Sequence, residues 1–480
     1  MEIVTHLGIW FYSLMMVATV IAIIVDKRDP VKSLAWIVVI VLLPVLGFIL
    51  YITFGQNFRR RRKLTLKEAS LKSRLGRIAD KQMNEINNLH FDIFPNLTRN
   101  INIIKLLLNN NLSTLTIDNE ITILKDAATT FDDIKRELLK ATKFIHIEYY
   151  IIERGEVWDS IVEILRAKVK EGVEVRIIFD DVGSWGIKKR HINRMRRYGF
   201  KVESFMPVLF PRFTSRINHR NHRKIIVIDG LVGFTGGINI ADRYVKGTKK
   251  LGAWRDTHMR IEGSSLMSLE TIFIADWSFC SDERLDMMNY ITNVESTGSS
   301  GVQIASSGPD SDWESIMQAF FLAITSAKNH IYISTPYFIP NSAILTALKV
   351  ASMSGVDVRI IIPYKADAKL TYWATRSYVS ELLDAGIKVY HYRGGFNHSK
   401  ILMIDSHFST IGTVNMDVRS FEDNFEVTAM IYDKEKTLEL ERQFMEDISE
   451  STLIIRSDWD MNPKITNFYE GLARLLSPLL

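Results

Sequence analysis

The longest apolar runs of this chain lie at its amino-terminal end. Residues 7–25 and 34–54 contain no charged residue, and the polar segment 26–30 separates them. Each run is about long enough to cross a bilayer as a helix. The pattern predicts a hairpin of two transmembrane helices, with both ends of the hairpin on the same side of the membrane. A shallow re-entrant hairpin is the alternative.

The charges beside these runs predict their orientation. Residues 59–63 read Arg-Arg-Arg-Arg-Lys and follow the second run, whereas the connecting loop contributes only Lys27, Arg28 and Lys32. The positive-inside tendency therefore places the hairpin ends, and the rest of the chain, in the cytoplasm. Apolar residues then recur on one helical face over residues 64–78, interleaved with Lys and Arg. This pattern fits a helix on an anionic lipid surface or, equally, a solvated linker helix. Residues 85–115 indicate only polar, Asn-rich loops.

Shorter apolar runs occur twice in the remainder of the chain. Residues 172–178 (Gly-Val-Glu-Val-Arg-Ile-Ile) return as residues 355–361 (Gly-Val-Asp-Val-Arg-Ile-Ile), and residues 144–150 resemble residues 330–337. Each half reads as strand, helix, strand, helix, strand and a further buried strand. This alternation predicts two α/β lobes with largely parallel central sheets, related by a pseudo-twofold axis.

The further buried strand of each half carries the same polar residues at the same spacing. The pattern is His-x-Lys-x4-Asp, with Gly seven residues and Asn ten residues after the Asp. Its members are His222, Lys224, Asp229, Gly236 and Asn239 in the first copy, and His398, Lys400, Asp405, Gly412 and Asn415 in the second. Two matching copies in one chain are not a coincidence of composition.

The spacing of this motif has a physical interpretation. Four apolar residues separate Lys from Asp in each copy, which is typical of a strand buried on both faces. Side chains alternate along a strand, so the His and Lys share one face and the Asp points away from it. We therefore expect Asp229 and Asp405 to hold local structure, and the His and Lys to meet the substrate. A twofold axis brings the two copies to one shared site.

Composition limits the other classes of function. The chain has 60 Lys and Arg against 55 Asp and Glu, so its charge does not indicate a nucleic-acid-binding protein. Cys280 is the only cysteine, which excludes an internal disulfide and a cysteine-rich metal site. No group of carboxylates and His at ligand spacing stands out beyond the motifs, so we predict neither a metal nor another cofactor.

The duplicated motif resembles the phospholipase D superfamily. Residues 254–258 (Trp-Arg-Asp-Thr-His) and 415–426 resemble the bacterial cardiolipin synthases more closely, and the likeness extends over essentially the whole chain. Many relatives carry Gly-Ser after the motif, whereas this chain carries Gly236-Gly237 and Gly412-Thr413. Thr413 can still form a side-chain hydrogen bond, and Gly237 cannot.

The resemblance implies a phosphatidyltransferase that condenses two phosphatidylglycerol molecules into cardiolipin and glycerol, through a phosphohistidine intermediate. It implies that His222 is the nucleophile and that His398 is the acid and base. Lys224 and Lys400 then neutralise the phosphate, and Asn239 and Asn415 donate to it. A carboxylate should orient each His. Glu426 has the spacing from the motif Asn that the superfamily uses for this purpose, and alignment of the two halves pairs Asp256 with it.

The predicted organisation has four parts. Residues 1–58 form two transmembrane helices, residues 59–115 a basic membrane-proximal linker, and residues 116–295 and 296–480 the two phospholipase D-like lobes. The implied location is the bacterial cell membrane, with phosphatidylglycerol and other anionic lipids as partners and no nucleic acid. The alternatives are a hydrolytic phospholipase D and a phosphatidyltransferase that uses another alcohol, because the same covalent intermediate serves any acceptor.

Overall fold

The computed structural model describes residues 2–25, 30–43, 45–54, 66–88, 95–208, 219–292 and 298–477. The chain divides into two compact units. One comprises residues 1–62 with 208–219, and the other comprises residues 63–207 with 220–480.

The first unit contains three apolar helices, α1 (Glu2–Val25), α2 (Pro30–Leu42) and α3 (Leu46–Phe54). The second predicted span is divided between α2 and α3, because the backbone of Val45 adopts the left-handed conformation with φ 65°. Within the described ranges, no helix combines the length and the apolar character that crossing a membrane requires. The predicted transmembrane hairpin is therefore not confirmed. The basic run 59–63 lies outside the described residues.

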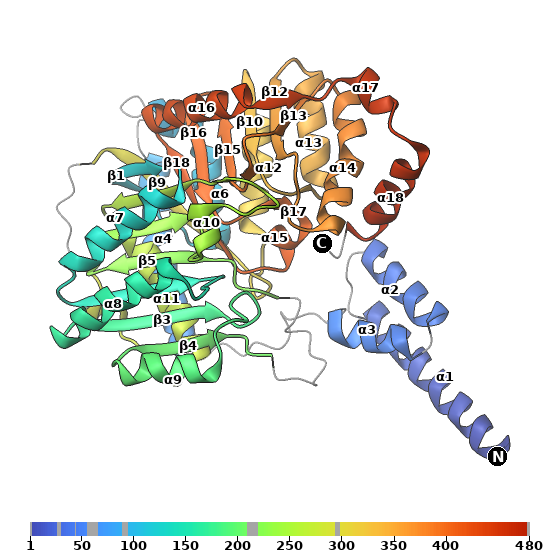
Figure 1. Cartoon of the computed structure of the whole chain (residues 1–480), viewed down its shortest axis with the longest axis horizontal. Coiled ribbons are helices and arrows are strands. Elements are labelled where there is room, and N and C mark those ends of the chain that lie inside the picture. Colours follow the sequence, from blue (N-terminus) through green and yellow to red (C-terminus); the bar gives the residue numbers. More distant parts are fainter. Residues whose placement is uncertain are drawn as a thin grey trace. The chain divides into compact units, whose positions relative to one another are not determined.

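The second unit is built on one continuous sheet (Figure 1). In the part of the chain that the structure describes, fifteen strands follow the order β19-β13-β12-β10-β15-β16-β18-β9-β1-β8-β6-β5-β2-β3-β4. The first half supplies β1 (Thr116–Leu124), β2 (Phe144–Tyr149), β3 (Glu174–Asp180), β4 (Lys201–Phe205), β5 (Lys224–Ile228), β6 (Val232–Gly236) and β8 (His258–Glu262). The second half supplies β9 (Ser300–Ser307), β10 (His330–Ser334), β12 (Asp357–Pro363), β13 (Lys388–Tyr392), β15 (Ile401–Ile404), β16 (Phe408–Gly412), β18 (Glu426–Tyr432) and β19 (Ser451–Leu453).

The strand order reveals the duplication directly. Read outward from the antiparallel pair of β1 and β9, the two halves present equivalent strands in the same order, and β19 is an addition at one edge. The prediction of largely parallel sheets is wrong. Within the fifteen-stranded sheet of the described residues, the parallel neighbours are β2, β3 and β4 and, likewise, β10, β12 and β13. Each motif strand is antiparallel to both of its neighbours. The tight turn after the motif Asp accounts for one of these pairings, because it returns the chain as the next strand.

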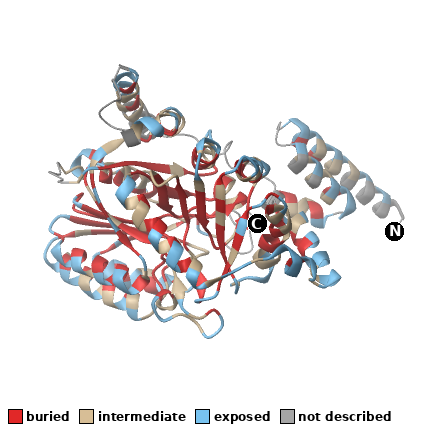
Figure 2. Cartoon of the chain, turned by 90° about the horizontal axis from the view of Figure 1, so that it is seen from above, coloured by how far each residue is buried: buried red, intermediate tan, exposed pale blue. Residues whose placement is uncertain are grey.

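Helices cover both faces of this sheet. On one face, α7 (Ala127–Lys140), α8 (Glu156–Lys170) and α9 (Lys189–Arg197) pack on the first half, and α12 (Ser315–Ser326), α13 (Ser342–Met353) and α14 (Lys369–Asp384) pack on the second. On the other face, α11 (Leu266–Cys280) and α16 (Lys434–Ser449) share one apolar cluster with strands of both halves. Figure 2 shows the buried residues concentrated on the strands and on the inner sides of these helices.

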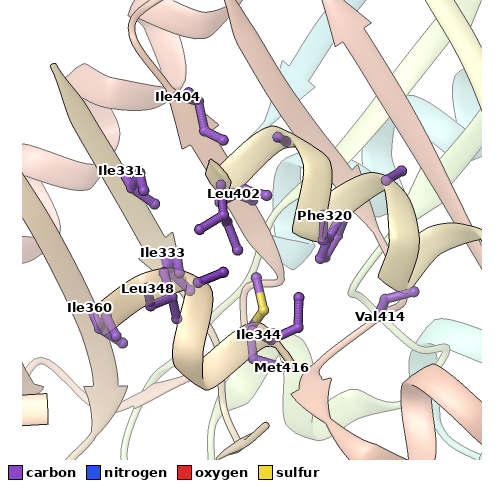
Figure 3. Packing of buried hydrophobic residues seen from close by; sticks show 14 of the residues in the cluster. Phe320, Ile331, Ile333, Ile344, Leu348, Ile360, Leu402, Ile404, Val414 and Met416 are labelled. Carbon is purple, nitrogen blue, oxygen red and sulfur yellow. The ribbon is translucent and has the colours of Figure 1, made fainter. Parts of the chain in front are cut away.

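The core of the second half illustrates why these strands form. Ile331, Ile333 and Ile360 project from β10 and β12 toward Ile344 and Leu348 of α13 (Figure 3). β-Branched residues suit such a strand, because they pack well on a pleated surface that is covered by helices. The motif strand β15 contributes Leu402 and Ile404 to the same cluster, and Met403 to the cluster on the opposite face. Both faces of the motif strand are therefore buried.

Residues 66–111 include two helices that complete this core. The helix predicted near residues 64–78 is present as α4 (Leu66–Asn88), and its Ala79 and Ile86 belong to the apolar cluster of the second half. The expectation of Asn-rich loops over 85–115 is wrong for α6 (Ile101–Asn111), which buries Ile103, Ile104 and Leu107. A short helix, α5 (Pro95–Arg99), precedes it. The last turn of α6 carries Asn110 and Asn111, which are half-buried and donate hydrogen bonds to Gln318 at 2.7 Å and to the carbonyl oxygen of Ser306 at 2.6 Å. These polar residues made the segment look like a loop in the sequence.

Candidate active site

The motif Asp residues form the turns that end the two motif strands. Asp229 and Asp405 have φ of 54° and 52°, in the left-handed region that Asp tolerates better than most residues. The carboxylate of Asp229 accepts hydrogen bonds of 2.7 to 2.8 Å from the backbone N–H groups of residues 142–144. Asp405 accepts bonds of 2.8 Å from residues 328–330 in the same way. Each Asp thereby ties its motif strand to the start of the neighbouring strand, and its side chain is directed away from the His and Lys.

Short backbone pairings join the segments before the two motif strands to the opposite lobe. The N–H of His222 donates to the carbonyl oxygen of Phe425 at 2.9 Å, and the N–H of His398 donates to that of Arg255 at 2.7 Å. The second contact continues the small parallel pairing of β14 (Phe396–Asn397) with β7 (Trp254–Arg255). Glu426 and Asp256 are the next residues along the chain, so these pairings bring each carboxylate to the His of the other lobe.

Both motif His residues are therefore paired with a carboxylate across the lobe boundary. The Nδ1 atom of His222 lies 3.0 Å from Glu426, and the Nδ1 atom of His398 lies 2.7 Å from Asp256. Both carboxylates are buried. A carboxylate at Nδ1 fixes the ring orientation and leaves Nε2 available for chemistry. The structure thus brings together His222, His398, Glu426 and Asp256. Because each His is paired with a carboxylate of the opposite lobe, the site requires both halves of the chain.

The two motif lysines are buried beside the two His residues. The Nζ atom of Lys224 donates to the carbonyl oxygen of His222 at 2.7 Å, and that of Lys400 donates to the carbonyl oxygen of His398 at 2.6 Å. Lys400 also lies 3.2 Å from Nε2 of His398. Burial, and after it the charge of Lys400, lowers the pKa of Lys224 to about 7. Burial lowers the pKa of Lys400 to about 8, although Asp256 and Glu426 oppose this shift. Two close, desolvated cations favour an anionic ligand.

The same charges act on the second His–carboxylate pair. Burial, followed by Lys400, lowers the pKa of His398 to about 4, although Asp256 acts in the opposite direction. Burial alone would raise the pKa of Asp256, but Lys400 and His398 outweigh it and lower that pKa. In the free site, His398 is therefore neutral at pH 7 and Asp256 is ionised. An anion that neutralises Lys400 would favour a proton on His398.

The residues after each motif differ between the lobes. The hydroxyl group of Thr413 donates a hydrogen bond to the carboxylate of Glu426, which is the kind of side-chain contact expected of this residue. At the equivalent position, a Cβ on Gly237 would collide with the carboxylate of Asp256, so glycine creates the space for that carboxylate. Asn239 accepts from the N–H of Ile151 and donates to Tyr244, whereas the buried amide oxygen of Asn415 has no hydrogen-bond partner among the described residues. The two Asn residues are not equivalent.

Beside His222 lies a cluster of buried polar and charged residues that is not apparent from the sequence. Arg223 forms an ion pair with Asp276, and its other N–H groups donate to the carbonyl oxygens of Glu426 at 3.2 Å and Ser307 at 3.3 Å. Asn221 accepts from the N–H of Arg223 at 3.0 Å and donates to Glu148 at 2.5 Å. Burial and the charge of Asp276 raise the pKa of Glu148 well above its usual range. The Asn before each motif His, Asn221 and Asn397, recurs in both halves and was a signal available in the sequence. No pattern in the sequence marked Arg223 or Glu148.

Comparison with known proteins gives consistent matches. The family described as "Cardiolipin synthase, PLD-like domain" matches residues 134–277 and 321–448, and the family "Phospholipase_D-nuclease N-terminal" matches residues 13–56. The chain is 40% identical over 472 residues to cardiolipin synthase 2 of Staphylococcus epidermidis, covering 98% of this chain and 96% of that protein. It is 39% identical to a cardiolipin synthase of Geobacillus kaustophilus, covering 98% and 92% of the two chains.

A solved structure shows the same fold. The crystal structure of phosphatidylserine synthase from Haemophilus influenzae matches with a TM-score of 0.59 and 13% identity, covering 80% of this chain and 100% of that one.

Proposed function

The chain belongs to the cardiolipin synthases with phospholipase D-like domains, and from this premise we propose that it condenses two phosphatidylglycerol molecules into cardiolipin and glycerol. One observation carries the proposal for the chemistry. Two His–carboxylate pairs, exchanged between the lobes, lie beside two buried lysines. Transfer of a phosphatidyl group needs a nucleophile, an acid and fixed positive charge around one phosphorus atom.

In the first half-reaction, Nε2 of His222 attacks phosphorus of the donor lipid. A phosphorus–nitrogen bond forms, the bond from phosphorus to the glycerol headgroup oxygen breaks, and His398 donates a proton to that oxygen. Lys224 and Lys400 neutralise the phosphate oxygens, which otherwise repel the incoming ring. The resemblance to the family supports the choice of His222 as the nucleophile. The bound phosphate offsets the charge of Lys400, which favours the protonated form of His398 that this step requires.

In the second half-reaction, the headgroup of a second phosphatidylglycerol supplies the acceptor hydroxyl. His398 accepts its proton, the oxygen attacks phosphorus, and the bond to His222 breaks. Cardiolipin leaves, both His residues return to their starting state, and no net proton is consumed. The carboxylates of Glu426 and Asp256 stabilise positive charge on the rings during each step.

The proposal includes a place for the enzyme in the cell. We propose that the amino-terminal helices hold it in the bacterial cell membrane as the predicted two-helix hairpin, with the lobes 116–295 and 296–480 in the cytoplasm. The family match over residues 13–56 supports this, as do the exposed apolar side chains of Trp10, Leu14 and Ile21 on α1. Labelling of cysteines introduced at residues 62 and 116, in sealed and in opened membrane vesicles, tests the orientation.

The reaction is tested with purified protein in vesicles that contain only phosphatidylglycerol. Mass spectrometry should find cardiolipin and glycerol formed in equal amounts. Phosphatidic acid without cardiolipin would instead show a hydrolase. Because the two lysines supply the positive charge in this mechanism, excess chelator should leave the initial rate unchanged, and a loss that magnesium or calcium restores would contradict the metal-free scheme.

A further inference from the structure

The last long helix of the chain presents its apolar residues to the outside. α18 (Lys464–Leu475) exposes 63% of Phe468 and 78% of Leu475. Ile465, Tyr469, Leu472 and Leu476 are also exposed and fall on the same side of the helix as Phe468 and Leu475, given 3.6 residues per turn. We call these six residues the outward face. A soluble surface helix normally shows the opposite arrangement, with its apolar stripe toward the core.

The inner side of α18 holds the helix in this orientation with polar contacts to α14. Glu470 accepts from Nε of Arg376 at 2.9 Å, and both groups are buried. Arg474 donates to Glu381 at 2.7 Å, and the hydroxyl of Tyr378 donates to that of Ser477 at 3.2 Å. Turning the outward face toward α14 would carry Glu470 away and leave the buried guanidinium group of Arg376 without its carboxylate. These contacts hold the helix in place, and an apolar face of this kind marks a surface that meets another molecule, a membrane or another part of the chain.

The outward face adjoins the amino-terminal end of α14, which follows Asp367. Trp373 in the first turns of α14 contacts Tyr469, with ring centres 5.5 Å apart. Asp367, two residues before α14 begins, accepts a hydrogen bond from Tyr337 and is among the carboxylates whose charge reaches Lys400. Figure 1 shows α14, α17 (Arg456–Asp460) and α18 side by side at one end of the second half.

Positive charge accompanies this apolar surface. Lys369 and Lys464 begin the two adjacent helices, and both are exposed, as is Lys365 in the loop before α14. Aromatic and aliphatic side chains beside exposed lysines match the chemistry of an anionic bilayer surface. The apolar residues enter the boundary between headgroups and acyl chains, and the ammonium groups meet lipid phosphates.

We propose that the outward face of α18, with Lys369 and Lys464, docks the catalytic lobes on an anionic lipid bilayer and presents the lipid surface to the site of Lys400. This inference rests on the proposed function, because an enzyme whose substrates are both lipids must draw them from the bilayer. The two experiments below give separate readouts for docking and for lipid conversion.

The docking is measured by fluorescence in the full-length protein. An environment-sensitive dye is attached at Phe468→Cys in a Cys280→Ala background, in phosphatidylglycerol vesicles that contain brominated acyl chains. Bromine should quench the dye at least about twofold. The matched control is Leu139→Cys on α7, an apolar residue that is also exposed but belongs to the other lobe, and its dye should keep its intensity. This readout requires no turnover, so it stands if the proposed reaction fails.

The consequence for turnover is measured with the variant Ile465→Ser/Phe468→Ser/Leu472→Ser. Its rate on phosphatidylglycerol vesicles should fall about tenfold, while its rate on a short-chain, monomeric phosphatidylglycerol and its melting temperature stay unchanged. Leu139→Ser should leave all three quantities unchanged. Equal losses on vesicles and on the monomeric lipid would overturn the inference, because docking affects only lipid that is presented in a bilayer.

Other occupants of the face give distinct results. An unquenched dye at residue 468 that cross-links to residues 2–54 would show that the amino-terminal helices of the chain cover it. An unquenched dye with cross-links between copies that rise with protein concentration would show a dimer interface. Either result overturns docking on lipid, whether or not cardiolipin forms in the same vesicles.

Discussion

The two halves of the site have the same strand arrangement, but different side chains adjoin the motif His in each half. Under His222, the chain places Arg223, Asp276 and Glu148, all buried. Arg223 links the first motif strand to the carbonyl oxygen of Glu426, the residue that orients His222. The equivalent of Arg223 is Ser399, which meets the hydroxyl of Thr257 at 3.2 Å. The equivalent of Glu148 is Ser334, which donates to Asn397 at 3.2 Å.

This difference distinguishes the residues that both halves share from those that differ between them. The motif His and Lys, the turn Asp and the exchanged carboxylate are present in both halves. The ion pair of Arg223 with Asp276 holds the first half, and neutral hydroxyls hold the second. Charge-assisted hydrogen bonds are about twice as strong as neutral ones, so His222 and Glu426 should be held more firmly than His398 and Asp256. A nucleophile needs a fixed line of attack, whereas an acid and base must exchange protons with two different alcohols.

The largest expected effect comes from removing either His. His222→Ala and His398→Ala should each reduce cardiolipin synthesis by at least about a thousandfold, because each removes a different group of one reaction. The comparison becomes sharper with labelled phosphatidylglycerol. His398→Ala should accumulate label on the peptide that contains His222. Label on residues 397–400 in the His222→Ala background would reverse the two roles, and near-normal synthesis by either variant would refute the single shared site.

The exchanged carboxylates should have the next largest effect. Glu426→Gln and Asp256→Asn keep the shape of the side chain but lose the charge that stabilises a protonated ring, so each should lower kcat by about a hundredfold. Rapid-quench measurements separate the two. Glu426→Gln should slow formation of the covalent intermediate more than its transfer, whereas Asp256→Asn should slow both steps, because His398 acts in each of them. If Asp256→Asn leaves either step at its original rate, the assignment of Asp256 to His398 is wrong.

The lysines predict a loss of activity as pH rises. A lysine is charged below its pKa, and these values are about 7 for Lys224 and about 8 for Lys400. Lys224 should therefore lose its proton first, and kcat/KM should fall by about tenfold between pH 7 and pH 8. Lys224→Arg keeps its charge and should move the start of this decline up toward pH 8, whereas Lys400→Arg should leave it near pH 7. The measurement that checks this prediction is the pH at which kcat/KM begins to fall in each variant, rather than the absolute value of kcat/KM.

Much of the site was predictable from residues that are close in sequence. The motif spacing follows from one strand and its turn, so the direction of His222, Lys224 and Asp229 could be deduced from side-chain alternation. The candidate carboxylates followed from aligning the halves. Their exchange between lobes could not be deduced, because it depends on the pairing of β1 with β9 and on the contacts of His222 with Phe425 and of His398 with Arg255.

Other features depend on partners distant in sequence. The parallel sheet was a wrong prediction, because alternating strands and helices do not reveal the hairpin that follows each motif Asp. α6 was missed because its burial depends on the second lobe, where Gln303 donates to the carbonyl oxygens of Ile104 and Ser113. Arg223 reads as an ordinary surface charge between His222 and Lys224. Only the folded chain supplies Asp276, 53 residues later, as its buried partner.

The smallest expected effect on the rate is also the direct test of the asymmetry beneath the two His residues. Arg223→Ser introduces the residue type of the second half and should lower kcat about fivefold with KM unchanged, whereas Ser399→Ala should change kcat less than twofold. Arg223→Ser also leaves Asp276 as an unpaired buried charge, which costs about 3–5 kcal/mol of stability. The double variant Arg223→Ser/Asp276→Ser removes that charge, so it should regain most of the melting temperature. Because the carbonyl group of Glu426 still lacks its guanidinium donor, kcat should stay low. Recovery of kcat together with stability would show that Arg223 only supports the fold, and that both His residues are positioned equally well without it.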